Sequence, residues 1–215
     1  MSEDPSGAPS TAPGVDGKAD PDRVFTEARL QDALLSAEAF GERAKVTGTD
    51  LGTFGPYGHG DWGGCEPAED LVEEQNGFDG ASAMQTVRLG PVTEDAQWIT
   101  VQLVSMPAAR TVRYLEIQRR LRELCPEVTV DTDAAPVQEH HHTREIAALG
   151  DEAMVDILRV TGGDEYDGSP SYAVDVRVGG VLAIVNAGGD RDTAVSLAAK
   201  ATQRIRTELY GTDGK

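Results

Sequence analysis

Apolar residues recur every three or four positions in three stretches of the chain, which is the spacing that places them on one face of a helix. These stretches are 26–41, 107–125 and 190–211. Gly41 and Gly211 offer helix stops, and Pro107 suits a first helical turn. We therefore expect three amphipathic helices, the last of them beginning after an aspartate N-cap at 190 or 192.

Between these helices, apolar and polar residues alternate as they do in strands. Strands are expected at 83–89, 96–105, 127–132, 137–145 and 153–160, and a hairpin at 172–187. The hairpin turn is Gly179-Gly180, a strong two-residue turn signal, and 83–89 should pair with 96–105 in a second hairpin. Because helices and strands do not alternate as βαβ units, the pattern predicts an α+β fold, with helices packed on a mainly antiparallel sheet.

The two ends of the chain lack the apolar residues that a core requires. Residues 1–24 are rich in Ser, Pro, Gly and Asp, and we expect a disordered tether there, one α+β domain at 25–211, and a disordered tail at 212–215. No export signal is recognisable in the chain as given. A Ser/Pro/Gly/Asp tether is nevertheless what commonly follows the anchoring cysteine of a bacterial lipoprotein, so a signal removed from ahead of Met1 is one interpretation.

The net charge of the chain limits the classes of partner that we expect. The net charge of −18 repels nucleic-acid backbones and anionic lipid heads, so we expect no nucleic-acid binding, and membrane association only through an N-terminal lipid anchor. The longest unbroken apolar run, at 181–185, is far shorter than the roughly 20 residues that a membrane-spanning helix needs.

One short stretch, GTFGPYGHGDWGGCEP at 52–67, combines glycines with one of the two cysteines. It lacks the lysine of a phosphate-binding loop, and the acidic residues after it oppose the thiolate that a nucleophilic Cys65 would need. A disulfide between Cys65 and Cys125 is favoured if the chain is exported, whereas two reduced cysteines are the alternative in a reducing compartment. Tyr57, His59 and Trp62 of this stretch, together with Trp98, are the candidate ligand-binding residues.

A run of three histidines, His140 to His142, suggests a metal site at first sight. On a strand, His140 and His142 share one face and His141 points to the other, so the run offers two ligands where a closed zinc site takes four. We expect a solvated strand and no metal, with metal binding or a pH response as alternatives.

Five arginines fall within thirteen residues of the helix at 107–125 and form the chain's one basic cluster. We expect them on the helix faces that point away from the core. A solvated face is the simpler interpretation, and Arg110, Arg113 and Arg120 are the candidate surface for an acidic partner. No catalytic triad, zinc-protease motif or cofactor fingerprint is present, so we expect neither catalytic activity nor a cofactor.

Several segments together resemble the PknH-like extracellular sensor domains of actinobacteria, which occur on receptor kinases and as separate lipoproteins. They are LQDALLSAEAF, GGCEP, WITVQLVSMPAARTVRYLEIQRRLRELCP, ALGDEAM and VRVGGVLAIVNAGGDRDTAVSLAAKATQRI, and they cover about residues 28–208. The resemblance implies an exported domain whose helices and antiparallel sheet border a ligand cleft. Cys65 and Cys125 match the first cysteine pair of that family, while its second pair has no counterpart here.

These observations lead to three functional hypotheses. The first is an extracytoplasmic, lipid-tethered sensor-like domain that binds an unidentified small molecule and has no catalytic activity. The second is a protein-interaction module of the cell envelope, which would use a surface such as the arginine helix. The third is an enzyme that uses Cys65 or the histidines 140–142.

Overall fold

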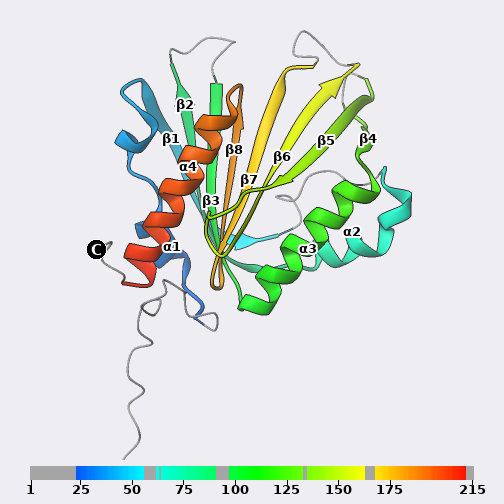
Figure 1. Cartoon of the computed structure of the whole chain (residues 1–215). Helices are drawn as coiled ribbons and strands as arrows, with labels where there is room; N and C mark the ends of the chain where they lie inside the picture. The colour runs from blue at the N-terminus through cyan, green and yellow to red at the C-terminus, as the bar shows by residue number, and fades with distance from the viewer. Residues whose placement is uncertain are drawn as a thin grey trace, which may run out of the picture.

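The computed structural model of this chain describes residues 23–55, 62, 64–90, 97–132, 135–162 and 168–211. In these residues one antiparallel sheet has the strand order β1-β2-β3-β8-β7-β6-β5-β4 (Figure 1). The strands are β1 (Ala44–Phe54), β2 (Gly80–Leu89), β3 (Gln97–Ser105), β4 (Glu127–Val130), β5 (Val137–Glu145), β6 (Glu152–Thr161), β7 (Pro170–Val178) and β8 (Val181–Gly188). The predicted α+β class is therefore confirmed.

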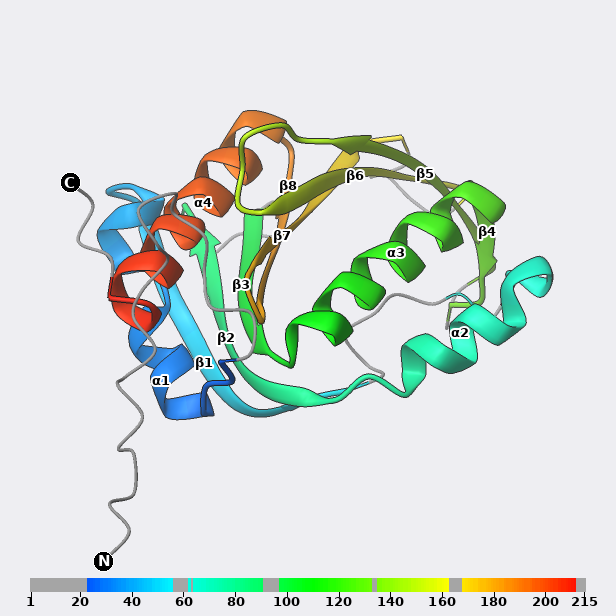
Figure 2. The ribbon, with the colours of Figure 1, turned by 60° about the horizontal axis from the view of Figure 1, so that its bottom comes forward.

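Helices cover both faces of this sheet. They are α1 (Glu27–Ala33), α2 (Glu69–Asn76), α3 (Ala108–Leu124) and α4 (Arg191–Arg204), with the 3₁₀ turns η1 (Ala37–Phe40) and η3 (Glu66–Ala68) and the π-helical turn η4 (Ile205–Leu209). Figure 2 shows α1 lying with α4 and α2 lying with α3, as two separate pairs. No helix among the described residues is long and apolar enough to cross a membrane.

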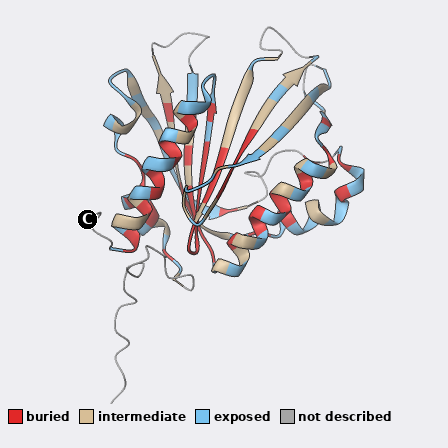
Figure 3. Cartoon of the chain, viewed as in Figure 1, coloured by how far each residue is buried: buried red, intermediate tan, exposed pale blue. Residues whose placement is uncertain are grey.

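Alternation along the strands builds two cores. Odd-numbered residues of β3 and β8, such as Val101 and Val185, pack with α1 and α4, and we call this side of the sheet the α4 face. Even-numbered residues such as Val104 and Leu182 pack with α3, and we call this side the α3 face. Figure 3 shows buried positions gathered in the strands and on the helix surfaces turned toward them.

The two predicted hairpins are confirmed. β2 pairs with β3, and β7 pairs with β8 across Gly179-Gly180, where Gly179 has a positive φ of 60° that suits a two-residue turn. The predicted N-cap of the last helix is Asp190, whose carboxylate accepts hydrogen bonds from the backbone N–H groups of Asp192 and Thr193.

The first expected helix and the edge strand β1 differ from the prediction. The helix expected at 26–41 ends at Ala33, where Leu34 adopts an extended backbone (φ −60°, ψ 159°), and both Leu34 and Leu35 pack into the core. Strand β1 was not predicted, since it is an edge strand with mostly exposed residues and shows little alternation. A register irregularity between Val46 and Gly48 disturbs its pattern further.

Cys65 and Cys125 form a disulfide, which ties the chain before α2 to the C-terminal end of α3. Gly64, beside Cys65, passes close to β4, and a Cβ atom there would lie 2.8 Å from the carbonyl oxygen of Thr129. This glycine therefore serves a close backbone approach. Most of the expected tether at 1–24 and all of the tail at 212–215 lie outside the described residues.

Candidate functional site

A cleft of about 420 Å³ opens on the α3 face of the sheet. Its floor comes from β3, β8, β7, β6 and β5, and its walls come from α3 and Trp62. Near the β7–β8 turn, α3 packs closely on large apolar residues such as Leu182 and Ile184. Farther along the same strands the side chains are short, at Ser171, Ala173 and Gly188, and the hollow lies there.

A charged cluster forms the polar end of the cleft. The Nε atom of Arg122 lies 3.0 Å from Oδ2 of Asp156, and Nδ1 of His141 lies 2.7 Å from the same oxygen. Thr143 donates a hydrogen bond to the other carboxylate oxygen of Asp156. The side chains of Arg122, His141 and Asp156 are each less than one-tenth exposed. Such buried charges are tolerated because each has a partner of opposite charge.

The environment moves the pKa values of these groups apart. Burial alone would raise the pKa of Asp156, but its hydrogen bond with His141 and the charge of Arg122 outweigh burial and lower the pKa to about 2. Burial alone would lower the pKa of His141, and its hydrogen bonds with Asp156 and Glu139 outweigh that effect and raise it. Asp156 is thus a carboxylate at neutral pH, and His141 is biased toward its charged form.

Asp175 on β7 is a second buried carboxyl in the cleft. Burial raises the pKa of Asp175 to about 6, an effect that the charge of Arg122 partly offsets and that of Asp156 reinforces. Its Oδ2 atom lies 4.0 Å from Nη2 of Arg122, which is beyond hydrogen-bond distance. Within the described residues, Arg122 is its sole ion-pair partner, and the charge of Asp175 also acts on the buried hydroxyl of Tyr114.

Gln118 on α3 lines the cleft with one donor unused. Its Oε1 atom accepts a hydrogen bond of 2.8 Å from Nη1 of Arg122. Because arginine can only donate, this contact fixes which end of the amide faces Arg122, so Nε2 is the free end. The side chain is 1% exposed, and in the described part of the chain Nε2 has no hydrogen-bond partner. A buried amide in this state lacks a partner that a bound molecule could supply.

Two tryptophans that the sequence analysis named as candidate ligand-binding residues border the cleft. Trp62 is 5% exposed, and its ring centroid lies 4.7 Å from that of His141, while the guanidinium of Arg122 lies 5.9 Å from the Trp62 ring. Trp98 on β3 is 51% exposed, although most large apolar side chains of the chain are buried. The other two candidates, Tyr57 and His59, lie outside the described residues.

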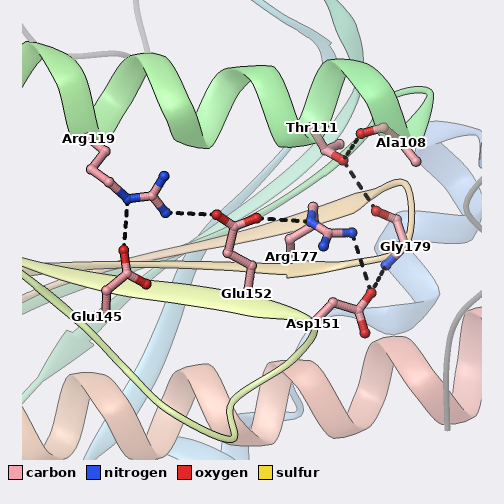
Figure 4. A network of polar contacts seen from close by, with 8 residues as sticks. All are labelled: Ala108, Thr111, Arg119, Glu145, Asp151, Glu152, Arg177 and Gly179. Carbon is pink, nitrogen blue, oxygen red and sulfur yellow. Dashed lines mark hydrogen bonds and ion pairs between the residues drawn. The ribbon is translucent and has the colours of Figure 1, made fainter. Parts of the chain in front are cut away.

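A chain of ion pairs holds α3 over the sheet (Figure 4). Arg119 lies 2.7 Å from both Glu145 on β5 and Glu152 on β6, and Glu152 also contacts Arg177 on β7 at 3.4 Å. Arg177 in turn lies 3.5 Å from Asp151.

The N-terminal end of α3 is held by hydrogen bonds at the β7–β8 turn. The carboxylate of Asp151 accepts a hydrogen bond from the backbone N–H of Gly179, and the Thr111 hydroxyl donates to the Gly179 carbonyl. Both ends of α3 are therefore fixed relative to the cleft floor.

The three histidines alternate across β5 as predicted, but the expected solvated strand is wrong for His141. Its side chain is 7% exposed, because its neighbours Trp62 and Asp156 enclose it. His140 contacts Glu127 and Thr161, and His142 accepts a hydrogen bond from Arg144. Among the described residues, no group of three or more His, Cys, Asp or Glu side chains is arranged to hold a metal ion.

The arginines of α3 do not all lie on outer faces. Arg110, Arg113 and Arg120 are exposed and pair with acids of this chain, namely Asp79 for Arg110, Glu74 and Glu116 for Arg113, and Glu123 for Arg120. Arg122 contradicts the expectation, since its side chain is 9% exposed and faces the cleft. It lies eight residues after the buried Tyr114, on the same side of the helix.

Sequence reasoning missed four cleft residues: Gln118, Arg122, Asp156 and Asp175. The sequence nevertheless contains a pattern that could have identified them. Gln118 and Arg122 follow Tyr114 at steps of four, and each aspartate interrupts an apolar strand. Polar residues at inward positions of otherwise apolar elements indicate a functional or specificity role more often than a charge on a solvated face does.

Comparison with protein-family models found no match, and comparison with curated protein sequences found none either. Among solved structures, the chain is similar to the extracellular domain of PknH from Mycobacterium tuberculosis, with a TM-score of 0.61 and 14% sequence identity. The match covers 86% of this chain and 98% of that domain. At this identity the likeness concerns the fold alone.

Proposed function

We propose that this chain is an extracytoplasmic, sensor-like domain that binds a small molecule in the cleft of the α3 face and has no catalytic activity of its own. The observation that carries the proposal is the cleft itself, where an open hollow of about 420 Å³ meets a buried polar cluster and an unpaired amide donor. This combination of volume, apolar lining and a few convergent polar groups is typical of small-molecule sites.

Export is supported by two observations. The disulfide between Cys65 and Cys125 is of the kind that persists in oxidising compartments. The fold is similar to that of a domain described as extracellular. The tether at 1–24, and a lipid anchor ahead of it, belong to this proposal and account for how such a domain would be held at a membrane.

The two alternatives have less support. An enzyme using a Cys65 thiolate would first have to break the disulfide, and His141 is engaged with Asp156 and Glu139. An interaction module using Arg110, Arg113 and Arg120 would have to displace the acids with which these arginines already pair. The interaction module can be tested by charge reversal on α3.

The test uses protein purified after incubation with the small-molecule fraction of an actinobacterial cell-envelope extract, and native mass spectrometry as the readout. Ala173→Trp fills the floor of the cleft, and Ser171→Trp is a second blocking variant in case the first disturbs folding. Thr49→Trp, at an exposed position of β1, is the matched control. We expect a bound mass with the unmodified chain and with Thr49→Trp, and none with either blocked variant.

Two results would contradict the proposal. Equal retention of the same mass by the blocked and unblocked proteins would place binding elsewhere. In a parallel incubation with the whole extract, retention of an envelope protein that is lost with Arg113→Glu and Arg120→Glu, while no small molecule is retained by any variant, would favour the interaction module instead.

A further inference from the structure

We propose that the cleft takes an uncharged, hydroxyl-rich ring compound of the saccharide class. This inference rests on the proposed function, since it names the ligand chemistry of the same cleft. It is drawn from the hydrogen-bonding capacity that the cleft residues leave unused and from the shape of the exposed floor.

The unused capacity at the buried end consists of one donor and one acceptor. The donor is Nε2 of Gln118, which has no hydrogen-bond partner among the described residues. The acceptor is the carboxyl of Asp175, whose Oδ2 atom lies 4.0 Å from Nη2 of Arg122. Both side chains lie beside the guanidinium of Arg122, whose Nη1 atom is 2.8 Å from Oε1 of Gln118 and whose Nη2 atom is 4.0 Å from Oδ2 of Asp175. A ligand that fits both residues must therefore accept from an amide and donate to a carboxylate.

A free amide donor and a carboxyl acceptor in one cleft distinguish neutral ligands from charged ones. An ammonium group could pair with Asp175, but it has no lone pair to offer the Gln118 amide and would face the guanidinium of Arg122. A carboxylate could accept from Gln118, but it would be repelled by Asp175 when that group is ionised. A hydroxyl group both donates and accepts, so a ligand with several hydroxyls can satisfy both residues.

The remaining charges of the cleft are already compensated. Arg122 and His141 share Asp156, and His141 also lies 3.6 Å from Glu139. A charged ligand would have to compete with these ion pairs, and leaving a buried partner unpaired is costly. The cluster therefore provides a fixed polar wall and does not offer a vacant counter-charge.

The open part of the floor alternates apolar and polar surface. Trp98 presents an indole ring that is 51% exposed, and the hydroxyls and amide of Thr100, Ser171 and Asn186 lie on the same face of the sheet. Beside Trp98, Gly188 leaves open space, with no atom within 4 Å of where a Cβ would be. A saccharide ring has apolar C–H faces and a rim of hydroxyls, and it can stack on an aromatic ring while its rim forms hydrogen bonds.

The experiment measures binding of defined probes through the indole N–H resonance of Trp98. The neutral probes are N-acetylglucosamine, its β-1,4 dimer, trehalose and methyl arabinofuranoside. Glucosamine supplies an ammonium, glucuronate supplies a carboxylate, and N-acetyl-dialanine amide supplies a neutral peptide. We expect saturable shifts with at least one neutral saccharide and none with the charged analogue of the same ring.

Two variants test whether binding depends on Gln118 and Trp98. Gln118→Met keeps the side-chain length and removes the donor, and we expect at least about a tenfold loss of affinity, as for other buried hydrogen bonds. Gln85→Met is the matched control, since Gln85 is also buried with an unpaired Nε2 but packs outside the cleft. Because Gln118→Met also removes an acceptor from Arg122, Trp98→Ala, read by calorimetry, is the second variant and should weaken binding as well.

The outcomes separate this inference from the proposed function. Binding of glucosamine, glucuronate or the peptide amide that Ala173→Trp abolishes, with no neutral saccharide bound, would overturn the saccharide class and leave the small-molecule cleft standing. Equal saccharide affinity in Gln118→Met and in the unmodified chain would also overturn the inference. If Ala173→Trp changed the binding of none of the probes, both the saccharide inference and the proposed small-molecule cleft would be wrong.

Discussion

The Nδ1 atom of His141 on β5 lies 2.7 Å from Oδ2 of Asp156 on β6, and both side chains are almost fully buried at one end of the cleft. The two strands are neighbours in the sheet, and both residues point to the α3 face. Arg122 reaches the same carboxylate from α3, so the contact joins the floor of the cleft to its wall. The polar end of the cleft is therefore held together by contacts within the chain.

The first prediction concerns the pKa of His141, which should lie above the usual 6.5 in the unmodified chain. Asp156→Asn removes the hydrogen-bonded charge that favours the imidazolium, whereas burial and the charge of Arg122 stay. We expect the pKa of His141 to fall in this variant, where its hydrogen bond with Glu139 is the one remaining contact that raises it, as measured by NMR titration of the imidazole resonances. His142, on the opposite face of the sheet, is the internal control. An unchanged titration of His141 would mean that Asp156 does not stabilise the protonated imidazole.

The second prediction concerns Asp175, whose pKa is raised to about 6 in the fold. An unfolded aspartate titrates near 3.9, so between about pH 4 and pH 6 the folded state holds a proton that the unfolded state has lost. The unfolding free energy should fall with rising pH across that window. Asp175→Asn should remove this fall and stabilise the fold at pH 7 by about 1 to 3 kcal/mol, measured by urea unfolding.

The same window isolates Asp175 from its neighbours. The pKa of Asp156 is lowered to about 2, so its stabilising effect is lost only as the pH falls below about 4. The pKa of His141 is raised, so its contribution is lost only as the pH rises above about 6.5. If Asp175→Asn were less stable than the unmodified chain at pH 7, Arg122 would need the second carboxylate as a counter-ion.

The third prediction concerns the ion pairs that hold α3. Glu152 contacts both Arg119 and Arg177 and is 24% exposed, whereas Glu145 contacts Arg119 and is 61% exposed. Glu152→Gln should lower the unfolding free energy by about 1 to 2 kcal/mol, and Glu145→Gln by less than about 1 kcal/mol, because exposed ion pairs contribute little. Equal losses in urea unfolding of the two variants would contradict a central role for Glu152.

The fourth prediction concerns the disulfide, whose cysteines are 60 residues apart in the chain. Closing a loop of this size restricts the unfolded chain, and replacing both cysteines with alanine should cost up to about 4 kcal/mol of stability. Chemical unfolding of the double variant measures the loss. A change below about 1 kcal/mol would mean that the packing around Trp62 holds this segment without the covalent bond.

Much of the fold could be predicted from periodicity, since Gly179-Gly180 and the Asp190 cap are local signals that neighbouring residues alone decide. β1 could not, because an edge strand with exposed side chains carries no strong apolar pattern, and its pairing with β2 is a tertiary contact. The break after Ala33 also depends on the core that buries Leu34 and Leu35.

The site was less predictable than the fold. Trp62 and Trp98 were named as candidate pocket residues, and both border the cleft. Arg122 was grouped with the exposed arginines, since its neighbours in sequence are basic and its aspartate partners lie on distant strands. A charge that is buried by tertiary partners looks the same in sequence as one on a solvated surface.

The most direct test of the account is the melting temperature of the chain and of Ala173→Trp, each with and without the small-molecule fraction of an actinobacterial cell-envelope extract. Binding to the folded state alone stabilises it by mass action, and a ligand at 100 times its Kd contributes about 2.7 kcal/mol. We expect a rise of several degrees for the unmodified chain and for Thr49→Trp, and no rise for Ala173→Trp or Ser171→Trp. An equal rise in all four proteins, or a rise only in the blocked pair, would contradict the assignment of the cleft as the binding site.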